Sequence, residues 1–273
     1  MSDESESKVK DIIEATTALV KAVPIYKDAI QPAAKEIGHA LEIVAKAINA
    51  ALLPIEGLVW GADKIRDFVH TRVAEKLRNT PPDCIKTPDP AVAGPALESL
   101  RYTGHQEALR EMYANLLANA IDERTAREAH PGFVEIIRNL NPDEARILKV
   151  LATRAPWPCI NINRIIKKDG TFVIKHKHLS TIALHAGCQI PQLSVSYIGN
   201  LERLGLVAIP NMYHLSDDSL YNEIRDHPQV KAILADISDD EHYKAEVAKQ
   251  GIEVTPLGRQ FIMACVVDKQ LRG

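Results

Sequence analysis

Residues 191–210 read PQLSVSYIGNLERLGLVAIP, and this stretch decides how the C-terminal half is expected to fold. Its apolar residues recur at helical spacing and are expected on the core side, namely Leu193, Tyr197, Ile198, Leu201 and Leu204. Gly205 is a typical C-terminal helix stop. The β-branched and apolar run 206–209 then predicts a strand that ends at Pro210. The stretch therefore predicts a helix followed directly by a strand.

The segments on either side complete the element order of a winged helix. A helix is predicted to start at 141–144, with Asn as N-cap, Pro at the first helical position and acids in the first turn. It is followed by a strand at 171–174 and a short helix at 179–186, and near the end by a strand at 252–254 and a last helix from 255. The predicted fold is therefore mainly α, with an N-terminal helical bundle or hairpin region followed by a winged-helix-like α+β module over residues 153–273. Residues 211–251 form an acidic insertion in its wing.

The N-terminal half is expected to be helical in several parts. Residues 1–7 are a predicted disordered tail, and 8–80 a helical region. Its first helix ends near Pro24, and a second runs over about 32–53. A third helix, 61–79, carries a narrow apolar face. Five prolines make 81–95 a predicted connector, extended or lying along a surface. One long helix is predicted over 96–127, within a central helical part that covers 96–152.

The composition favours a soluble protein of a reducing compartment. The apolar fraction is 46%, the charged fraction 25% and the net charge −3, so no global charge attracts nucleic acid or anionic lipid. The four cysteines include no C-x-x-C pair, and the first residues are acidic and polar, unlike a secretory signal. Residues 37–60 approach the length of a membrane span, but charged residues, Pro54 and Gly57 interrupt them. We expect a cytoplasmic protein, with membrane association as a disfavoured alternative.

The predicted recognition helix lacks the charge of a DNA reader. Its expected outward residues are Gln192, Ser194, Ser196, Asn200, Glu202 and Arg203. The insertion 211–251 holds nine acidic residues against four basic ones, a local charge of −5, where a wing would meet phosphate. One basic cluster is a candidate surface for nucleic acid or for an acidic partner: Arg164, Lys167, Lys168, Lys175 and Lys177. Direct DNA binding is thus disfavoured against a protein-contact role.

No catalytic motif is recognisable. The phosphate-binding, dinucleotide-binding, zinc-protease and nucleophile-elbow patterns do not occur. Four residues of types that bind zinc lie close in sequence, but their spacing matches no known zinc motif: His176, His178, His185 and Cys188. Cys188 with His185, and the carboxylates of Glu107, Glu111 and Asp122, are explained more simply as core and surface residues. We expect no catalytic residue, no metal and no cofactor, and hence no enzyme.

Residues 93–148 carry sequence motifs that identify a protein family more specifically than the order of helices and strands does. They include AGPAL (93–97), LREMYANLLANA (109–120), HPGFVEII (130–137) and LNPDEARIL (140–148). This combination resembles the Abi-alpha (abortive infection alpha) family of bacterial proteins, most strongly over residues 90–150 and more loosely in the C-terminal half. The resemblance implies a role in defence against bacteriophage, in which an infected cell halts growth or dies. It brings no catalytic residues.

Within these motifs, five residues are candidate positions for packing or for partner contact: Asn115, Asn119, His130, Pro131 and Phe133. Asn115 and Asn119 are four apart and share one helix face. If buried, their amides need partners and could fix one inter-helix register; the alternative is a ligand or partner surface. Three hypotheses follow: a non-enzymatic defence protein acting through contacts with an unidentified protein or a second copy, a winged-helix DNA-binding regulator, and a membrane effector using residues 37–60.

Overall fold

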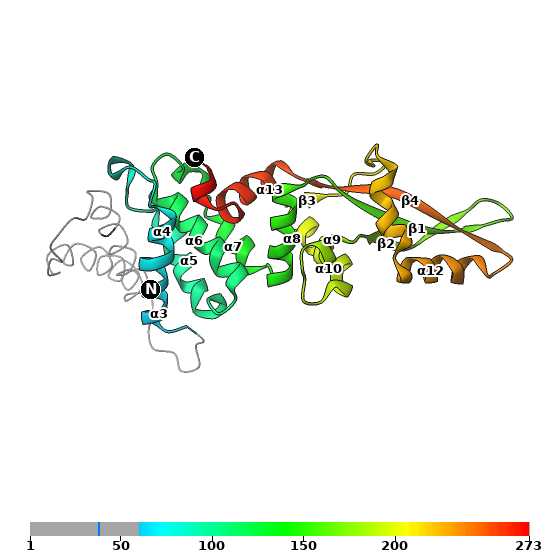
Figure 1. Ribbon diagram of the computed structural model, residues 1–273, viewed down its shortest axis with the longest axis horizontal. Coiled ribbons are helices and arrows are strands. Elements are labelled where there is room, and N and C mark those ends of the chain that lie inside the picture. Colours follow the sequence, from blue (N-terminus) through cyan, green and yellow to red (C-terminus); the bar gives the residue numbers. More distant parts are fainter. Residues whose placement is uncertain (1–37, 39–59, 273) are drawn as a thin grey trace, which may run out of the picture. The chain divides into compact units, whose positions relative to one another are not determined.

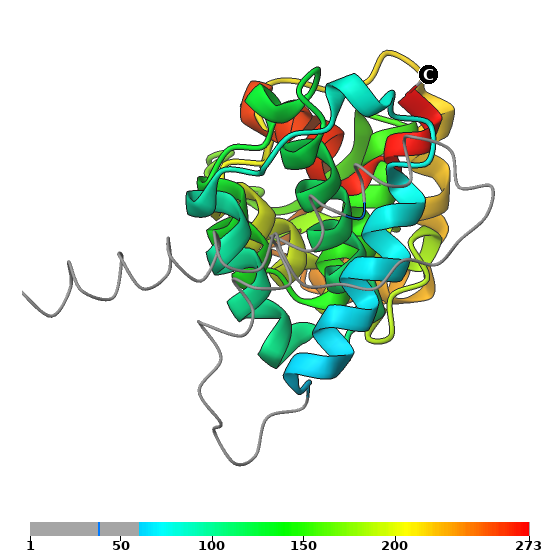
Figure 2. The same ribbon diagram turned by 90° about the vertical axis from the view of Figure 1, so that its left-hand side faces the viewer.

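A computed structural model describes residues 38 and 60–272 of the chain (Figures 1 and 2). The chain forms two compact units: one holds the residues up to Leu140 together with those from Met263 onward, and the other is Asn141–Ile262. The chain therefore passes from one unit to the other twice. The predicted tail 1–7, the first two predicted helices and nearly all of the stretch 37–60 lie outside the described residues.

The first unit begins with a helical rod. It consists of α3 (Ala62–Phe68), a π-helical turn at Val69–Val73 and α4 (Ala74–Lys76). The apolar face predicted for 61–79 is buried along its whole length, in Ile65, Phe68, Val69, Val73 and Leu77. The prediction of a helix that packs on one side is confirmed.

The predicted single helix over 96–127 is wrong, because two helices occupy this region: α5 (Pro90–Thr103) and α6 (Glu107–Ile121). α5 starts inside the predicted connector, since Pro90 takes the first turn and the Asp89 carboxylate accepts a hydrogen bond from Ala91 N at 2.8 Å. The break follows Gly104, a poor helix former, where the Trp60 ring lies in the space that a Cβ would need.

The proline-rich segment before α5 is ordered along the end of α6. Lys86 N donates to Ile121 O, and Glu123 N donates to Cys84 O, both at 2.8 Å. After α7 (Gly132–Arg138) the chain leaves this unit, and it returns with a π-helical turn at Ile262–Val266 and a 3₁₀ turn at Lys269–Arg272. Both views show these C-terminal turns, in red, beside the helices of the first unit (Figures 1 and 2).

The second unit combines helices with one antiparallel sheet in the order β2-β1-β4-β3. Its main elements are α8 (Pro142–Thr153), β1 (Trp157–Ile166), β2 (Phe172–Leu179), α9 (Ile182–His185), α10 (Ser194–Arg203), β3 (Val207–Ala208), α11 (Asn222–Asp226), α12 (Pro228–Ser238), β4 (Tyr243–Val254) and α13 (Pro256–Phe261). The predicted helix 191–204 and the strands at 206–209 and 252–254 all appear, with shifted bounds.

β1 was not predicted. Its apolar pattern is interrupted by two buried asparagines, Asn161 and Asn163, whose side chains bond within the sheet. Asn161 Oδ1 accepts from His178 N at 2.9 Å, and Asn163 Nδ2 donates to Glu246 at 3.2 Å. These partners come from β2 and β4, so the local sequence does not reveal them.

The acidic insertion 211–251 is a packed layer. It contains α11, α12 and most of β4, and its apolar residues Tyr221, Ile224, Val230 and Ile237 are buried together with Ile160 and Ile162 of β1. The acids are exposed on α11, α12, β4 and the turns that join them, and so belong to a packed layer and not to a free wing.

Candidate functional site

The amides of Asn115 and Asn119 lie one turn apart on α6 and are buried. Asn115 Nδ2 donates to the Cys265 carbonyl, and Asn119 Nδ2 to the Ala264 carbonyl, each at 2.9 Å. These acceptors belong to the returning π-helical turn, and the last carbonyls of a helix have no partner inside it. The amide pair therefore fixes the C-terminal segment against α6, and both side chains are withdrawn from any external ligand surface.

A buried ion pair closes the same contact. Lys269 Nζ lies 3.0 Å from Asp122 Oδ2 and donates to Thr125 Oγ1 at 2.8 Å. Burial alone would raise the pKa of Asp122, but hydrogen bonds from Arg124 and Lys269 outweigh it and hold that pKa well below its usual range. Asp122 is therefore ionised at neutral pH as part of a structural network, and it is not paired with Glu107 or Glu111.

His130, Pro131 and Phe133 shape the start of α7. His130 Nδ1 accepts a hydrogen bond from Gly132 N at 3.0 Å, and a Cβ at Gly132 would stand 3.0 Å from the same nitrogen. Phe133 is buried, with its ring centroid 5.7 Å from that of His130. The histidine thus acts as a helix cap that requires the glycine beside it.

Asp143 and Glu144, at the start of α8, position α10. Asp143 accepts hydrogen bonds from the backbone of Gln189 (2.9 Å) and Ile190 (3.1 Å) and from the Tyr197 phenol (2.9 Å). Glu144 completes a capping box with Asn141. The sequence indicated these acids only as a helix start, because their long-range partners leave no local signal.

Glu144 adds a second contact to α10, since it accepts from Asn200 Nδ2 at 2.9 Å. Burial would raise the pKa of Asp143, but the backbone donors and Tyr197 outweigh burial and lower it. The start of α8 thus holds α10 through buried hydrogen bonds, which set where the outer face of α10 lies in the second unit.

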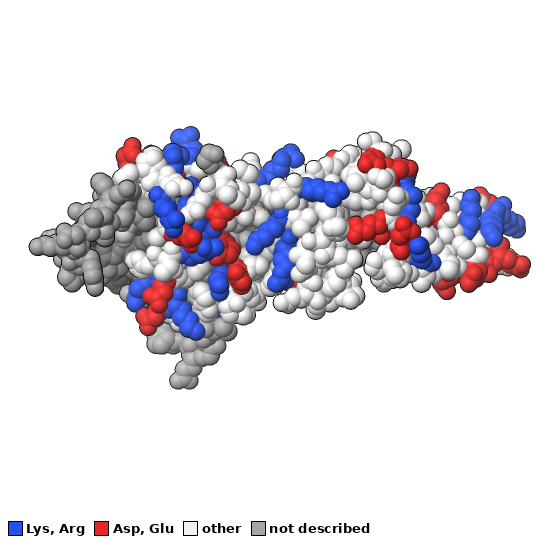
Figure 3. Space-filling view, viewed as in Figure 1, with Lys and Arg blue, Asp and Glu red and all other residues white. Residues whose placement is uncertain are grey.

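That outer face is apolar. Leu184 (48% exposed), Ile190 (51%), Leu193 (44%) and Val195 (40%) form what we call the α10 outer face. In Figure 3 the surface over α10 carries neither acidic nor basic colour. Leu193 was predicted to face the core; it is exposed because residues 191–193 form a 3₁₀ turn, which changes the phase of the side chains.

The predicted outward polar residues are only partly outward. Ser194 is buried and Asn200 is held by Glu144, while Gln192, Ser196, Glu202 and Arg203 are exposed. The Arg203 guanidinium donates to Asn200 Oδ1 at 2.7 and 3.0 Å. The exposed residues of α10 therefore offer one cation, Arg203, to a phosphate backbone, and that cation is already engaged with Asn200.

A pocket of about 350 Å³ borders this face in the second unit. Leu184 and Val195 lie on its rim, Ile224 and Val230 come from the packed insertion, and hydroxyl groups such as Thr181 line its side. No Lys, Arg, Asp or Glu contributes to the lining that the structure describes.

The five basic residues predicted as a patch all lie on the β1–β2 hairpin and its turn. The Arg164 guanidinium stacks 4.3 Å from the ring centroid of Tyr243. None of the five forms an ion pair with any residue in the described part of the chain. Acidic side chains lie next to the hairpin in Figure 3, where Lys167 N donates to His242 O beside Asp240 and Glu241. The patch is therefore mixed at its tip and basic along β2.

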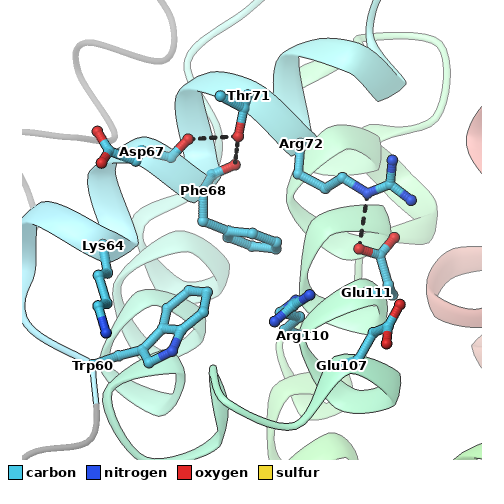
Figure 4. Close-up of a pocket in the computed structure, with 9 residues that line it drawn as sticks. All are labelled: Trp60, Lys64, Asp67, Phe68, Thr71, Arg72, Glu107, Arg110 and Glu111. Carbon is cyan, nitrogen blue, oxygen red and sulfur yellow. Dashed lines mark hydrogen bonds and ion pairs between the residues drawn. The ribbon is translucent and has the colours of Figure 1, made fainter.

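The first unit holds an open pocket of about 440 Å³ between the α3 rod and α6 (Figure 4). Trp60 and Phe68 form its aromatic side, with ring centroids 5.6 Å apart, and Arg110 lies 5.7 Å from the Trp60 ring. On the other side Arg72 Nε donates to Glu111 at 2.8 Å. The π-helical turn carries Thr71 and Arg72 into this pocket, and its shifted register is what aims them there.

Glu107 and Glu111 both line this pocket, but they do not form an acid–base pair. Lys76 Nζ lies 3.3 Å from Glu111 in addition to Arg72. Burial would raise the pKa of Glu111, but these two cations outweigh it and lower the pKa. Glu111 is therefore an ionised partner of fixed cations, unlike a general acid.

The remaining chemical candidates are separated from one another. His185 Nε2 pairs with Glu223 at 2.8 Å, whereas Cys188 Sγ donates to Asp143 O at 3.5 Å. Burial raises the pKa of the Cys188 thiol to about 11. Among the residues that the structure describes, no group of three or more His, Cys, Asp or Glu side chains could hold a metal ion. Within the same residues, no helix is both long and apolar enough to cross a membrane.

Comparison with known proteins adds one family and one structure. Residues 61–265 match the family described as "Abortive infection alpha". No curated protein matches the chain. A solved structure of an uncharacterized protein from the hydrocarbon-degrading marine bacterium Alcanivorax borkumensis SK2 is 19% identical, with a TM-score of 0.35, over 51% of this chain and 92% of that one. A likeness this low carries no argument about fold or function.

The family match starts just before the α3 rod and ends in the π-helical turn that Asn115 and Asn119 hold. It thus spans both units and contains every motif on which the sequence resemblance rests. The chain belongs to the abortive infection alpha family.

Proposed function

We propose that this protein acts in abortive infection, the response that sacrifices or arrests a phage-infected bacterial cell, and that it does so without catalysis, by binding a protein partner. The family supports the process. The α10 outer face supports the mode of action, because four exposed apolar side chains gathered within residues 184–195 are a feature of surfaces that bind protein. The pocket beside Leu184 and Val195, whose lining holds His176 and His227 but no Lys, Arg, Asp or Glu among the described residues, gives a partner side chain a place to insert.

A winged-helix DNA reader is the second candidate, and the topology favours it. We interpret α8, β1, α9, α10, β3 and β4 as a winged-helix core, with β1 and β3 on either side of β4. On this interpretation α10 would be the recognition helix. It presents Val195, Ser196, Glu202 and an arginine already engaged with Asn200, so its chemistry supports the protein partner better than a phosphate backbone.

The test is a phage-plating assay with matched surface variants. Cells that express the wild-type chain should show fewer plaques, and the double variant Leu184→Ser with Leu193→Ser should lose that protection while its unfolding midpoint stays near that of the wild type. Met212→Ser, which removes an even more exposed apolar side chain (95%) elsewhere, is the control and should protect. Plaque counts unchanged by the wild-type chain would overturn the defence role.

Full protection by the double variant would overturn the role of the α10 outer face instead. A gel shift with genomic DNA fragments tests the second candidate, DNA binding. The assay is run at low salt, about 50 mM, because phosphate contacts are strongest there. A shift at that salt that disappears in an Arg203→Ala variant would favour the second candidate.

A further inference from the structure

The outer edge of β2 is an unpaired edge of the sheet. β2 is the first strand in the order β2-β1-β4-β3, so its second edge has no neighbouring strand within the described part of the chain. Every residue from Phe172 to Lys177 is exposed, and Phe172 and Val173 keep 57% and 52% of their surface. An exposed, apolar sheet edge is a template for another strand, which proteins usually cover or interrupt.

The side chains along this edge are ordered by charge. Over Phe172–Ile174 side chains alternate between the two faces of the strand, so Phe172 and Ile174 share one face and Val173 lies on the other. The register with β1 then shifts, because Asn163 pairs with Ile174 and Ile162 with His176, so Lys175 is an extra residue at a β-bulge and Lys177 follows it. Neither lysine has an ion-pair partner in the described part of the chain. The acids of β4 stand two strand spacings away, about 10 Å, which is near the screening length in salt.

We propose that β2 binds an acidic, extended segment of a partner protein, which adds to the sheet as a further strand. Backbone hydrogen bonds along the open edge would supply affinity, and side-chain pairing would supply selectivity. In antiparallel pairing the segment would place apolar residues opposite Ile174, Val173 and Phe172, where the pairing of β2 is regular, and an acidic part beside the bulged stretch with Lys175 and Lys177. The expected pattern is an N-terminal part with two acids, followed by three β-branched or apolar residues.

Two other occupants fit this edge less well. A second copy would bring the same basic run, and overlap of the Lys175–Lys177 segments would place like charges opposite each other. A nucleic acid would use the cations but not the backbone edge. At the hairpin turn it would meet Asp239, Asp240 and Glu241, which precede the His242 carbonyl that accepts from Lys167 N. The site lies outside the α10 outer face, so the proposal does not depend on the proposed function.

Fluorescence anisotropy of the full chain with a labelled peptide tests the proposal. The probe carries the core Glu-Thr-Glu-Val-Val-Val, and a second probe replaces both glutamates by lysines. We expect the acidic probe to bind and the double variant Lys175→Glu with Lys177→Glu to weaken it by about tenfold or more, while binding of the lysine probe improves. Lys244→Glu with Lys231→Glu makes the same charge change on exposed lysines away from β2 and should leave binding unchanged.

Hydrogen exchange gives an independent readout, because strand addition protects backbone amides along β2 and a purely ionic contact does not. Equal binding of both probes, or loss of binding in the control variant, overturns the proposal. So does a single-stranded oligonucleotide that displaces the acidic probe. Sedimentation that shows a dimer of the wild-type chain, lost in the β2 variant, assigns the edge to a second copy and also overturns it.

Discussion

The phenol of Tyr197 on α10 donates a hydrogen bond to the carboxylate of Asp143 on α8 at 2.9 Å. The same carboxylate accepts the backbone N–H groups of Gln189 and Ile190, and Arg146 pairs with it from the next turn of α8. One buried acid thus satisfies donors from the helix start, from the segment before α10 and from α10 itself. The position of the α10 outer face therefore depends on Asp143.

Replacing Asp143 by asparagine should destabilise the chain by about 3 kcal/mol, because several buried donors lose a charged acceptor. Urea unfolding at pH 7 measures the change. Tyr197→Phe removes one of these bonds and should cost about 1 kcal/mol. Asp226→Asn, at an exposed helix end, is the control and should leave the unfolding midpoint in place. Similar midpoints for Asp143→Asn and Asp226→Asn would show that the clamp contributes little.

Stability should fall in acid because of Asp122 and Asp143, whose pKa values are both lowered in the folded chain. A carboxyl whose folded pKa lies below its unfolded value of about 3.9 stabilises the fold above that pH, and the gain is lost as the pH falls through the folded pKa. The unfolding free energy should therefore be level near neutral pH and decline below about pH 5.

The double variant Asp122→Asn with Lys269→Met isolates the Asp122 contribution, since it removes both charges of the pair together. Its urea midpoint should change less between neutral and acidic pH than that of the wild type. A decline as steep as that of the wild type would mean that other carboxyls account for the acid sensitivity.

Much of the secondary structure was predictable because its signals are local. The apolar face of the α3 rod, the capped start of α8 and the helix–strand sequence after Pro191 depend on neighbouring residues. The break at Gly104 was not predictable, since it involves Trp60, more than forty positions away. Nor was β1, because Asn161 and Asn163 gain their partners only in the assembled sheet.

The candidate site residues, too, were predictable only in part. The pair Asn115 and Asn119 stands out in the sequence by its spacing, but the carbonyls that it binds lie some 150 positions further on. The α10 outer face depends on where a 3₁₀ turn gives way to an α-helix, which shifts Leu193 from the predicted interior to the surface. Spacing identifies such residues, and only the tertiary contacts assign them a role.

Asn119→Ala should loosen the C-terminal segment selectively. The change leaves the Ala264 carbonyl without its amide donor and removes a contact to Lys269, at an expected cost of about 1–3 kcal/mol. Hydrogen exchange should speed up at residues 264–272 more than in α5, because that segment opens first. Asn211→Ala, an exposed substitution, is the control and should change neither region. Uniform acceleration in both regions would indicate global destabilisation instead.

Gly104→Ala should displace Trp60 from the pocket in Figure 4. The added Cβ would lie 2.3 Å from Trp60 Cδ2 and 2.6 Å from Leu100 O, so the indole must move, at an expected cost of about 1–3 kcal/mol. Gly94→Ala, inside α5 and with no described atom within 4 Å of the new Cβ, should instead stabilise the chain by about 0.5–1 kcal/mol.

Tryptophan emission measures the displacement. With Trp157→Phe as a common background, Trp60 is the one remaining tryptophan. Its emission should shift to the red in Gly104→Ala alone, because a displaced indole meets more water. Identical emission in the two variants would mean that Trp60 does not rest on Gly104.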